Sequence, residues 1–211
     1  MFTGIITEIG KIEKIENVSG KVFCTIKCQK MQSDLIIGES IACNGICLTV
    51  TNFTQNSITM EIMNQTYNIT TAKFWKVFTQ IHLEKALKLS DRLNGHIVQG
   101  HIDTISQLIK KKEENKTLYL DFNLPNEFET LLVPHGSIAI DGVSLTVANL
   151  YNGSFQVALI QHTQKVTFFE NLNTGDNVNL EFDIIGKYIQ RLANFPNKNT
   201  ITQEWLNENG F

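Results

Sequence analysis

Residues 40–53 read SIACNGICLTVTNF, and residues 137–150 read SIAIDGVSLTVANL. Eight of the fourteen aligned positions are identical at a spacing of 97 residues, and the same spacing pairs Thr66 with Thr163. Matches at one fixed spacing are the sequence signature of an internal repeat. The repeat covers nearly the whole chain, and the boundary between its two copies falls near residues 88–97.

Each copy has the local pattern of an all-β module. Short runs of β-branched and aromatic residues alternate with turn signals such as Asn44-Gly45. Residues 21–30, KVFCTIKCQK, alternate so that one inner face holds Val22, Cys24, Ile26 and Cys28. A small sheet loses its exposed edges when it closes into a barrel. We therefore predict an all-β fold, a tandem duplication of a six-stranded Greek-key β-barrel, with barrel 1 in residues 1–96 and barrel 2 in residues 97–182.

A C-terminal amphipathic α-helix follows the second copy. From Asp183 the sequence DIIGKYIQRLANF repeats apolar residues at helical spacing, and one stripe contains Ile184, Ile185, Tyr188, Ile189 and Leu192. We assign residues 183–211 to this helix and a tail. The stripe needs a surface to pack on, and two remain open: another subunit, or the chain's own barrel.

The composition limits the ligand and the compartment. The 211 residues are 42% hydrophobic and 18% charged with a formal net charge of -3, which is typical of a compact soluble protein. This charge offers no basic surface for nucleic acid or an acidic membrane, so we expect a small neutral or anionic ligand or a protein partner. The N-terminus lacks a signal-peptide pattern, and no apolar run reaches membrane-spanning length. All four cysteines lie in the first half, which suits reduced thiols and a cytoplasmic protein: Cys24, Cys28, Cys43 and Cys47.

Four motifs carry a specific resemblance. They are MFTGI at 1–5, NGICLTV at 44–50, GHIVQGHID at 95–103 and IDGVSLTV at 140–147. In this order and spacing they resemble the α-chain type of riboflavin synthase, over residues 1 to about 192. The resemblance implies two lumazine-binding barrels and a helix that joins three chains, with lumazine synthase as a further partner. It also implies a transferase without a cofactor, which converts two molecules of 6,7-dimethyl-8-ribityllumazine into riboflavin and 5-amino-6-(D-ribitylamino)uracil by four-carbon transfer.

A duplicated chain suits a reaction between two identical molecules. Two similar pockets hold both molecules, and fixing them side by side turns an encounter in solution into a unimolecular step. The molecules must still play different roles, because one donates four carbons and the other receives them. The informative positions are therefore those where the copies differ: Cys47 against Ser144, Ile5 against His101, Ala86 against Asp183, and Phe2 against Val98.

The resemblance also implies the site residues. The catalytic residues that it implies are Phe2, Cys47, His101, Ser144 and Asp183. Among them His101 is the natural proton carrier near neutral pH. For Cys47 and Ser144 two roles stay open, addition to the substrate ring or orientation of a water molecule.

Two substrate cradles are implied in equivalent positions of the copies. The first comprises Gly4, Ile5, Ile6, Ser40, Leu48, Thr49, Glu61, Ile62, Met63, Asn64, Gln65 and Thr66. The second comprises Gly100, Ile102, His135, Leu145, Thr146, Ala158, Leu159, Ile160, Gln161, His162 and Thr163. His135 departs from the family, which usually has a lysine there, so a fixed positive charge becomes a titratable one.

These assignments have structural competitors. Cys47 and Ser144 also fit ordinary strand positions, and Asp183 fits a helix N-cap, a role compatible with catalysis. Neither the Cys-x3-Cys pairs nor the segment from His96 to Asp103 matches the spacing of a closed ligand set, so we predict no metal site.

Two other functions compete with the synthase. A non-catalytic antenna protein of the same fold needs one tight lumazine or flavin site, and it can lose the MFTG start, Cys47 or Ser144. All three remain in this chain. A flavin-dependent oxidoreductase is weaker still, because no glycine-rich dinucleotide fingerprint is present.

Overall fold

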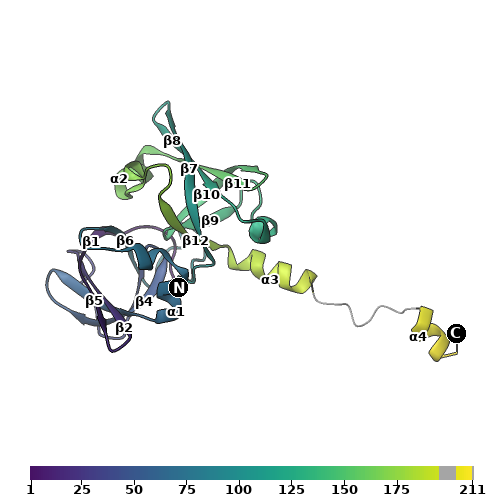
Figure 1. Cartoon of the computed structure of the whole chain (residues 1–211), viewed down its shortest axis with the longest axis horizontal. Coiled ribbons are helices and arrows are strands. Elements are labelled where there is room, and N and C mark those ends of the chain that lie inside the picture. The colour runs from purple at the N-terminus through teal and green to yellow at the C-terminus, as the bar shows by residue number, and fades with distance from the viewer. Residues whose placement is uncertain (195–202, 211) are drawn as a thin grey trace.

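The fold is two closed barrels of six antiparallel strands each, seen in a computed structural model that describes residues 1–194 and 203–210 (Figure 1). Barrel 1 has the spatial order β1-β2-β5-β4-β3-β6, with β1 Glu8–Val18, β2 Lys21–Lys27, β3 Ser40–Cys43, β4 Ile46–Phe53, β5 Ser57–Ile62 and β6 Gln80–Lys85. Barrel 2 has the order β10-β11-β8-β7-β12-β9, with β7 Thr104–Glu114, β8 Thr117–Asn123, β9 Ser137–Ile140, β10 Val143–Tyr151, β11 Ser154–Leu159 and β12 Asn177–Phe182. The helices are α1 Asn64–Ile69, η1 Thr71–Phe74, η2 Asn126–Leu131, α2 Gln161–Val166, η3 Phe169–Asn171, α3 Ile184–Ala193 and α4 Gln203–Glu208. The predicted all-β duplication is confirmed.

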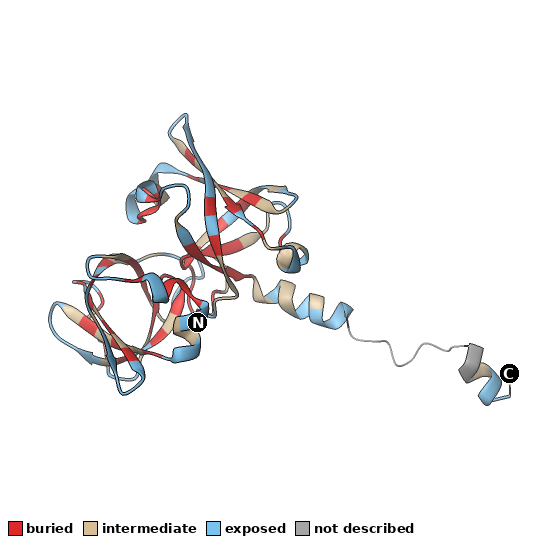
Figure 2. Ribbon diagram, viewed as in Figure 1, coloured by how far each residue is buried: buried red, intermediate tan, exposed pale blue. Residues whose placement is uncertain are grey.

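Each barrel closes around its own core because side chains alternate along its strands. Figure 2 shows buried and exposed residues alternating along the strands of both barrels. The alternation predicted for β2 is confirmed, since Cys24 and Cys28 are buried in the barrel 1 core. Burial raises the pKa of the Cys24 thiol to about 12, so this residue packs as an inert core side chain.

The first residues of each copy cross over to the barrel of the other copy. The Gly4 carbonyl accepts the Ser144 N–H at 2.8 Å, and the Gly100 carbonyl accepts the Cys47 N–H at 2.9 Å. Two isoleucines pack across in the same way: Ile6 against the barrel 2 core and Ile102 against the barrel 1 core. An outer face of either barrel is therefore completed by a segment from the other copy.

These reciprocal contacts relate the two copies by an approximate twofold rotation. Near its axis the β3–β4 and β9–β10 turns meet backbone to backbone. A Cβ added to Gly45 would lie 2.7 Å from the Gly142 nitrogen, and a Cβ added to Gly142 would lie 2.7 Å from the Gly45 nitrogen. Both residues also have positive φ, so any side chain there would push the barrels apart.

A buried amide joins the barrels beside this axis. From β12, the Asn179 Nδ2 donates to the Asn44 carbonyl at 2.9 Å, while its Oδ1 accepts the Thr71 N–H at 2.8 Å. Both partners belong to barrel 1. One side chain of barrel 2 therefore satisfies two buried backbone groups of its neighbour.

A buried imidazole of barrel 1 makes the equivalent contacts to backbone groups of barrel 2. From β6, the His82 Nδ1 lies 3.1 Å from the Asp141 carbonyl and its Nε2 accepts the Phe168 N–H at 3.0 Å. Because an N–H must donate to Nε2, the ring proton sits on Nδ1 and the imidazole is neutral. Burial lowers the pKa of His82 to about 3, in agreement with this tautomer.

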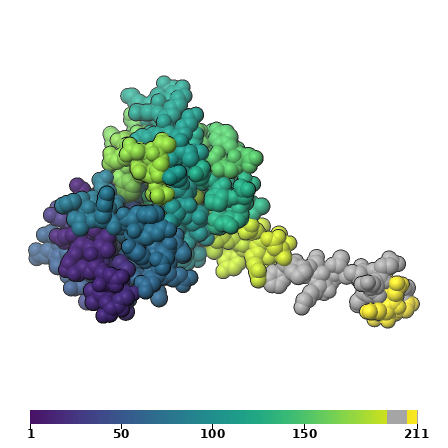
Figure 3. Space-filling model, viewed as in Figure 1, coloured from purple at the N-terminus to yellow at the C-terminus, as the bar shows by residue number. Residues whose placement is uncertain are grey.

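The predicted C-terminal helix is α3, which projects from the two barrels in Figures 1 and 3. Lys187 on α3 pairs with Asp103 of barrel 2 at 2.6 Å. Four residues of the predicted stripe are between 57% and 71% exposed: Ile185, Tyr188, Ile189 and Leu192. The stripe does not pack back onto its own barrel. The tail assigned with this helix lies partly outside the described residues, at 195–202 and 211. Among the described residues, no helix has the length and apolar character needed to cross a membrane.

Candidate active site

A row of outward-facing polar residues crosses each barrel. In barrel 1 the strand pairing puts Ser40 opposite Thr49, and Thr49 opposite Glu61. In barrel 2 it puts Ser137 opposite Thr146. Thr49 and Thr146 are exposed, and none of the five is buried. We call these rows strip 1 and strip 2. Strip 1 holds the predicted cradle residues Ser40, Thr49 and Glu61, and strip 2 holds the predicted Thr146 together with Ser137, which the sequence prediction did not name.

Four predicted cradle residues point the opposite way. Leu48 and Ile62 belong to the barrel 1 core, and Leu145 and Leu159 belong to the barrel 2 core. The sequence prediction named consecutive residues, whereas a strand sends every second side chain inward. For these four, only backbone atoms can serve a ligand on the outer face.

The segments after β5 and β11 have the same conformation in both copies. The Thr70 hydroxyl donates to the Thr66 carbonyl at 2.7 Å, and the Thr167 hydroxyl donates to the Thr163 carbonyl at 2.7 Å. Most other cradle residues of these segments are exposed: Met63, Asn64, Gln65, Ile160, Gln161 and His162. Ala158, within β11, is exposed as well. Each strip therefore ends at an accessible turn with polar side chains.

A cavity borders the start of each strip. One of about 580 Å³ lies between α3 and η2 and is lined in part by Ser137 and Asp183. Its barrel 1 equivalent has about 220 Å³ and is lined in part by Ser40 and Ala86. The two copies therefore differ in the space beside the strip, because α3 walls only the barrel 2 cavity. His135, exposed and at φ 65°, lies in the turn before β9.

Strip 1 and Cys47 form site 1 together with the crossing segment of copy 2. The Glu181 carboxylate accepts the N–H groups of Gln99, Gly100 and His101 at 2.6, 2.9 and 3.1 Å. A Cβ on Gly100 would lie 2.5 Å from the Cys47 Cβ, so only glycine allows this approach. The half-buried Cys47 and the exposed His101 thus lie on neighbouring segments of one site.

Strip 2 and Ser144 form site 2 with the crossing segment of copy 1. The Glu84 carboxylate accepts the N–H groups of Thr3 and Gly4 at 2.6 and 2.9 Å, as Glu181 does in site 1. Burial raises the pKa of both carboxyls, and the N–H donors oppose that shift. Ile5 takes the place that His101 has in site 1, so the predicted difference between the copies lies on equivalent segments.

Site 2 contains a histidine that the sequence prediction missed. The His96 Nδ1 lies 2.7 Å from the Ser144 Oγ. The preceding glycine makes the approach possible, because a Cβ on Gly95 would lie 2.1 Å from the Thr3 carbonyl oxygen. The sequence raised His96 only as a metal ligand, although its position in GHIVQGHID was an available signal. Among the described residues, no group of three or more His, Cys, Asp and Glu residues could hold a metal ion.

The charges around His96 suit proton transfer. Burial lowers the pKa of His96, and the nearby Asp183 carboxylate opposes that shift. A neutral His96 can accept the Ser144 hydroxyl proton at Nδ1, and Asp183 would stabilise the resulting imidazolium. The Asp183 carboxylate also accepts the Ile185 N–H at 2.9 Å, which confirms the predicted N-cap of α3.

Phe2, one of the predicted catalytic residues, lies between the two copies. Its side chain is fully buried in a cluster with Ala42, Val98 and Ala139, and its N–H donates to the Val98 carbonyl at 2.7 Å. This cluster joins the two copies behind Cys47. Phe2 therefore holds the crossing segment in place, and its catalytic role stays a prediction.

Comparison with known proteins agrees with this architecture. The lumazine binding domain family matches residues 3–86 and 99–183. Riboflavin synthase of Bacillus subtilis (strain 168) is 40% identical over 215 residues, covering 100% of both chains. Riboflavin synthase of Actinobacillus pleuropneumoniae is 37% identical, again with 100% of both chains covered. LumP complexed with riboflavin has a TM-score of 0.80 at 23% identity, covering 86% of this chain and 99% of that chain, a likeness of fold. The chain belongs to the riboflavin synthase family and contains two lumazine binding domains.

Proposed function

We propose that the chain catalyses the transfer of a four-carbon unit between two molecules of 6,7-dimethyl-8-ribityllumazine, as a transferase that forms riboflavin and 5-amino-6-(D-ribitylamino)uracil. One lumazine binds in site 1 and the other in site 2. The two substrates contain every atom of the two products, so no oxidant or reductant has to enter. The observation that carries the proposal is full-length similarity to riboflavin synthases together with two equivalent sites whose reactive side chains differ.

The chemistry needs a proton removed from a methyl group of one lumazine and a nucleophile added to the ring of the other. In site 2, His96 accepts a proton through Ser144, which it touches at 2.7 Å. In site 1, His101 serves the lumazine beside Cys47. The hydroxyls of strips 1 and 2 orient the rings, and the turns after β5 and β11 bind the ribityl chains.

Assembly is part of the proposal. The exposed stripe of α3 is an apolar surface of the kind that forms subunit contacts, and we assign it to a homotrimer in the cytoplasm. Association with lumazine synthase would be a further step. Within one chain we draw the units at residues 1–96, 97–182 and 183–211.

The deciding experiment mixes the purified protein with 6,7-dimethyl-8-ribityllumazine and follows riboflavin by fluorescence and chromatography. Steady formation of riboflavin with an equal amount of the pyrimidine product supports the proposal. Tight binding without turnover would instead favour the antenna function, for which the LumP structures share the fold. Cys47→Ser tests whether the signal comes from this protein rather than a contaminant.

A further inference from the structure

Each crossing segment is bound to its own barrel by one buried carboxylate. Glu84 on β6 and Glu181 on β12 are equivalent residues of the two copies, and their side chains belong to residues that are 5% and 2% exposed. Both accept backbone N–H groups of the crossing segments, and the Thr3 hydroxyl also donates to Glu84 at 2.6 Å. Hydrogen bonds to an ionised acceptor are about twice as strong as neutral ones, so each carboxylate fixes the path of its segment.

Glu181 fixes the segment that brings His101 into site 1. Its Oε2 accepts the N–H groups of Gly100 and His101, at 2.9 and 3.1 Å. The Gly100 carbonyl accepts the Cys47 N–H at 2.9 Å. One carboxylate of barrel 2 therefore holds the backbone that joins His101 to its contact with barrel 1.

Glu84 acts on the histidine of site 2 through Thr3. The Thr3 N–H and hydroxyl both donate to the Glu84 Oε1, each at 2.6 Å. The Thr3 carbonyl in turn accepts the His96 N–H at 3.2 Å. Thr3 thus links the carboxylate to the linker residue whose Nδ1 lies 2.7 Å from the Ser144 Oγ.

The two carboxylates end on different residues because the crossing segments differ. Glu181 accepts the His101 N–H itself, whereas the Ile5 N–H at the equivalent place donates to the Thr3 hydroxyl at 3.2 Å. Residues 1–7 contain no histidine, so the histidine nearest to Glu84 along these hydrogen bonds is the one on the linker. Each glutamate is therefore connected to one histidine.

We infer that the two glutamates are positioning residues that act crosswise. Glu84 of barrel 1 sets the histidine of site 2, and Glu181 of barrel 2 sets the histidine of site 1. Both are buried and bonded to the crossing segments, so they act through those segments. The inference rests on the proposed function, which places one lumazine in each site. Loss of one carboxylate should displace only one of the two histidines.

The test compares Glu84→Gln and Glu181→Gln in the full-length protein. An amide has one acceptor oxygen, and its NH₂ group would face the N–H donors that the carboxylate now accepts. In each variant kcat should fall about tenfold or more while KM changes less than about threefold, because a displaced histidine affects the chemical step more than the binding of the ring.

The first readout without substrate is the titration of His96 by NMR. Burial lowers the pKa of His96. In Glu84→Gln the imidazole should leave Ser144, so its pKa should rise toward the ordinary value. In Glu181→Gln the His96 titration should match that of the wild type. A loss of stability alone would not distinguish the two variants in this way.

The second readout is the rate at which iodoacetamide alkylates Cys47. The other three cysteines are buried: Cys24, Cys28 and Cys43. In Glu181→Gln the Gly100 segment no longer holds its place over Cys47, so alkylation should become about threefold faster or more. In Glu84→Gln the rate should stay within about twofold of the wild type, because this carboxylate holds the other segment.

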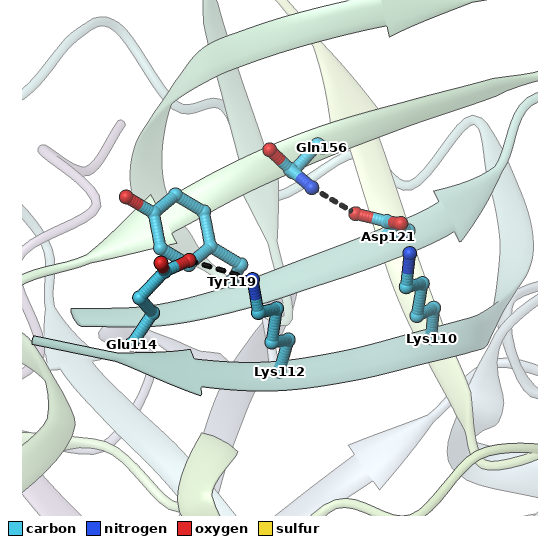
Figure 4. Close-up of a pocket in the computed structure, with 6 residues that line it drawn as sticks. All are labelled: Lys110, Lys112, Glu114, Tyr119, Asp121 and Gln156. Atoms are coloured by element: carbon cyan, nitrogen blue, oxygen red, sulfur yellow. Dashed lines mark hydrogen bonds and ion pairs between the residues drawn. The ribbon is translucent and has the colours of Figure 1, made fainter.

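Two carboxylates that hold no crossing segment are matched controls. In barrel 1, Glu8 accepts the N–H groups of Gln29 and Lys30, both at 2.7 Å. In barrel 2, Asp121 accepts the Gln156 amide at 2.6 Å in an outer pocket (Figure 4). Glu8→Gln and Asp121→Asn should change kcat by less than about twofold and leave both readouts as in the wild type.

Milder variants decide the question if a glutamine variant does not fold. Thr3→Val removes only the hydroxyl, and Glu181→Asp keeps the charge on a shorter side chain. Each should change the same readout as the glutamine variant, with kcat lowered about threefold.

Equal alkylation rates in the two glutamine variants would overturn the inference, as would an unchanged His96 titration in Glu84→Gln or full kcat in both. If the wild type formed no riboflavin, the proposed function would fall instead. That failure is distinct, because the NMR and alkylation measurements need no substrate.

Discussion

Replacing Asp141 with asparagine should stabilise the protein, and by more at pH 7.5 than at pH 5. Asp141 is buried in the β9–β10 turn at φ 43°, and its Oδ1 accepts the Asn179 N–H at 2.9 Å. Barrel 1 has Asn44 in the equivalent turn, where the amide oxygen accepts the His82 N–H at 2.7 Å. An asparagine amide can therefore keep the hydrogen bond and the positive φ while removing a buried carboxyl.

The magnitude follows from the pKa. Burial raises the pKa of Asp141 from 3.8 to about 8. In the unfolded chain Asp141 ionises above pH 3.8, whereas in the folded chain it stays protonated. Its burial therefore lowers the free energy of unfolding by an amount that is absent below pH 3.8 and grows until pH 8. At 1.36 kcal/mol per pH unit, the cost is about 2 kcal/mol at pH 5 and about 5 kcal/mol at pH 7.5. We expect Asp141→Asn to recover most of it.

The contribution of His82 to the free energy of unfolding has the opposite pH dependence, and it can be measured in the same variant. Its pKa falls from 6.5 to about 3, so its stabilising contribution is complete above pH 6.5 and is lost as the pH falls toward 3. That loss is about 2 kcal/mol at pH 5. In the wild type the Asp141 and His82 slopes oppose each other, whereas Asp141→Asn should lose about 2 kcal/mol between pH 7.5 and pH 5.

Urea unfolding followed by circular dichroism at both pH values measures these differences. Glu170→Gln is the control, an exposed carboxylate whose loss should change the unfolding free energy by less than about 0.5 kcal/mol. The reasoning fails if Asp141→Asn is less stable than the wild type at pH 7.5. It also fails if the gain is the same at both pH values, because a gain from the buried carboxyl must follow its titration.

The site and the assembly offer further tests. Cys47→Ser and Asp183→Ala each make one copy resemble the other, so single-turnover rates should fall about tenfold or more while a lumazine analogue still binds; unchanged rates in both would refute the asymmetry. His96→Gln removes the titrating group from site 2, so kcat should drop about tenfold or more and lose its dependence on pH below 6.5, and a persisting limb would exclude His96 as the proton acceptor. Deleting the chain from Ile184 onward should leave both barrels folded but abolish the trimer, which light scattering would contradict by showing an unchanged mass. Gly100→Ala should lower the unfolding free energy by about 2 kcal/mol, because φ is 83° and Cys47 leaves no room for a Cβ; an unchanged thermal midpoint would contradict the crossing contact.

The barrels could be predicted from the sequence because their signals are local. Alternation along β2 fixes which face is buried, and the repeat at constant spacing shows that both copies share one fold. The predicted cradles did not separate outward from inward side chains, because Leu48 and Leu145 point into the barrel cores, and the substrate contacts themselves stay a prediction. The packing of Phe2 depends on a contact with Val98, far away in the chain, which no local pattern reveals.

The crossing of the N-terminal segments of the two copies could not be predicted from the sequence either. Nothing in residues 1–7 indicates which barrel they contact, since either outer face would cover an apolar residue such as Ile6. The decisive contacts are long-range backbone hydrogen bonds that the Gly4 and Gly100 carbonyls accept, and a glycine alone does not show what approaches it. His96 was missed for the same reason, because its bond to Ser144 depends on the path of the linker.

The path of the linker between the copies makes the two sites differ in a way that amino-acid differences between the copies alone would not. Two free copies of one module, related by a twofold axis, would present identical sites to two identical substrates. A single chain passes from copy 1 to copy 2 only once, and the connecting segment carries His96 onto Ser144. After barrel 2 the described chain enters α3 instead, and the histidine on the segment that pairs with Cys47 is His101 of the crossing segment. Joining the copies therefore separates the two environments, which is what a reaction with one donor and one acceptor of the same compound needs.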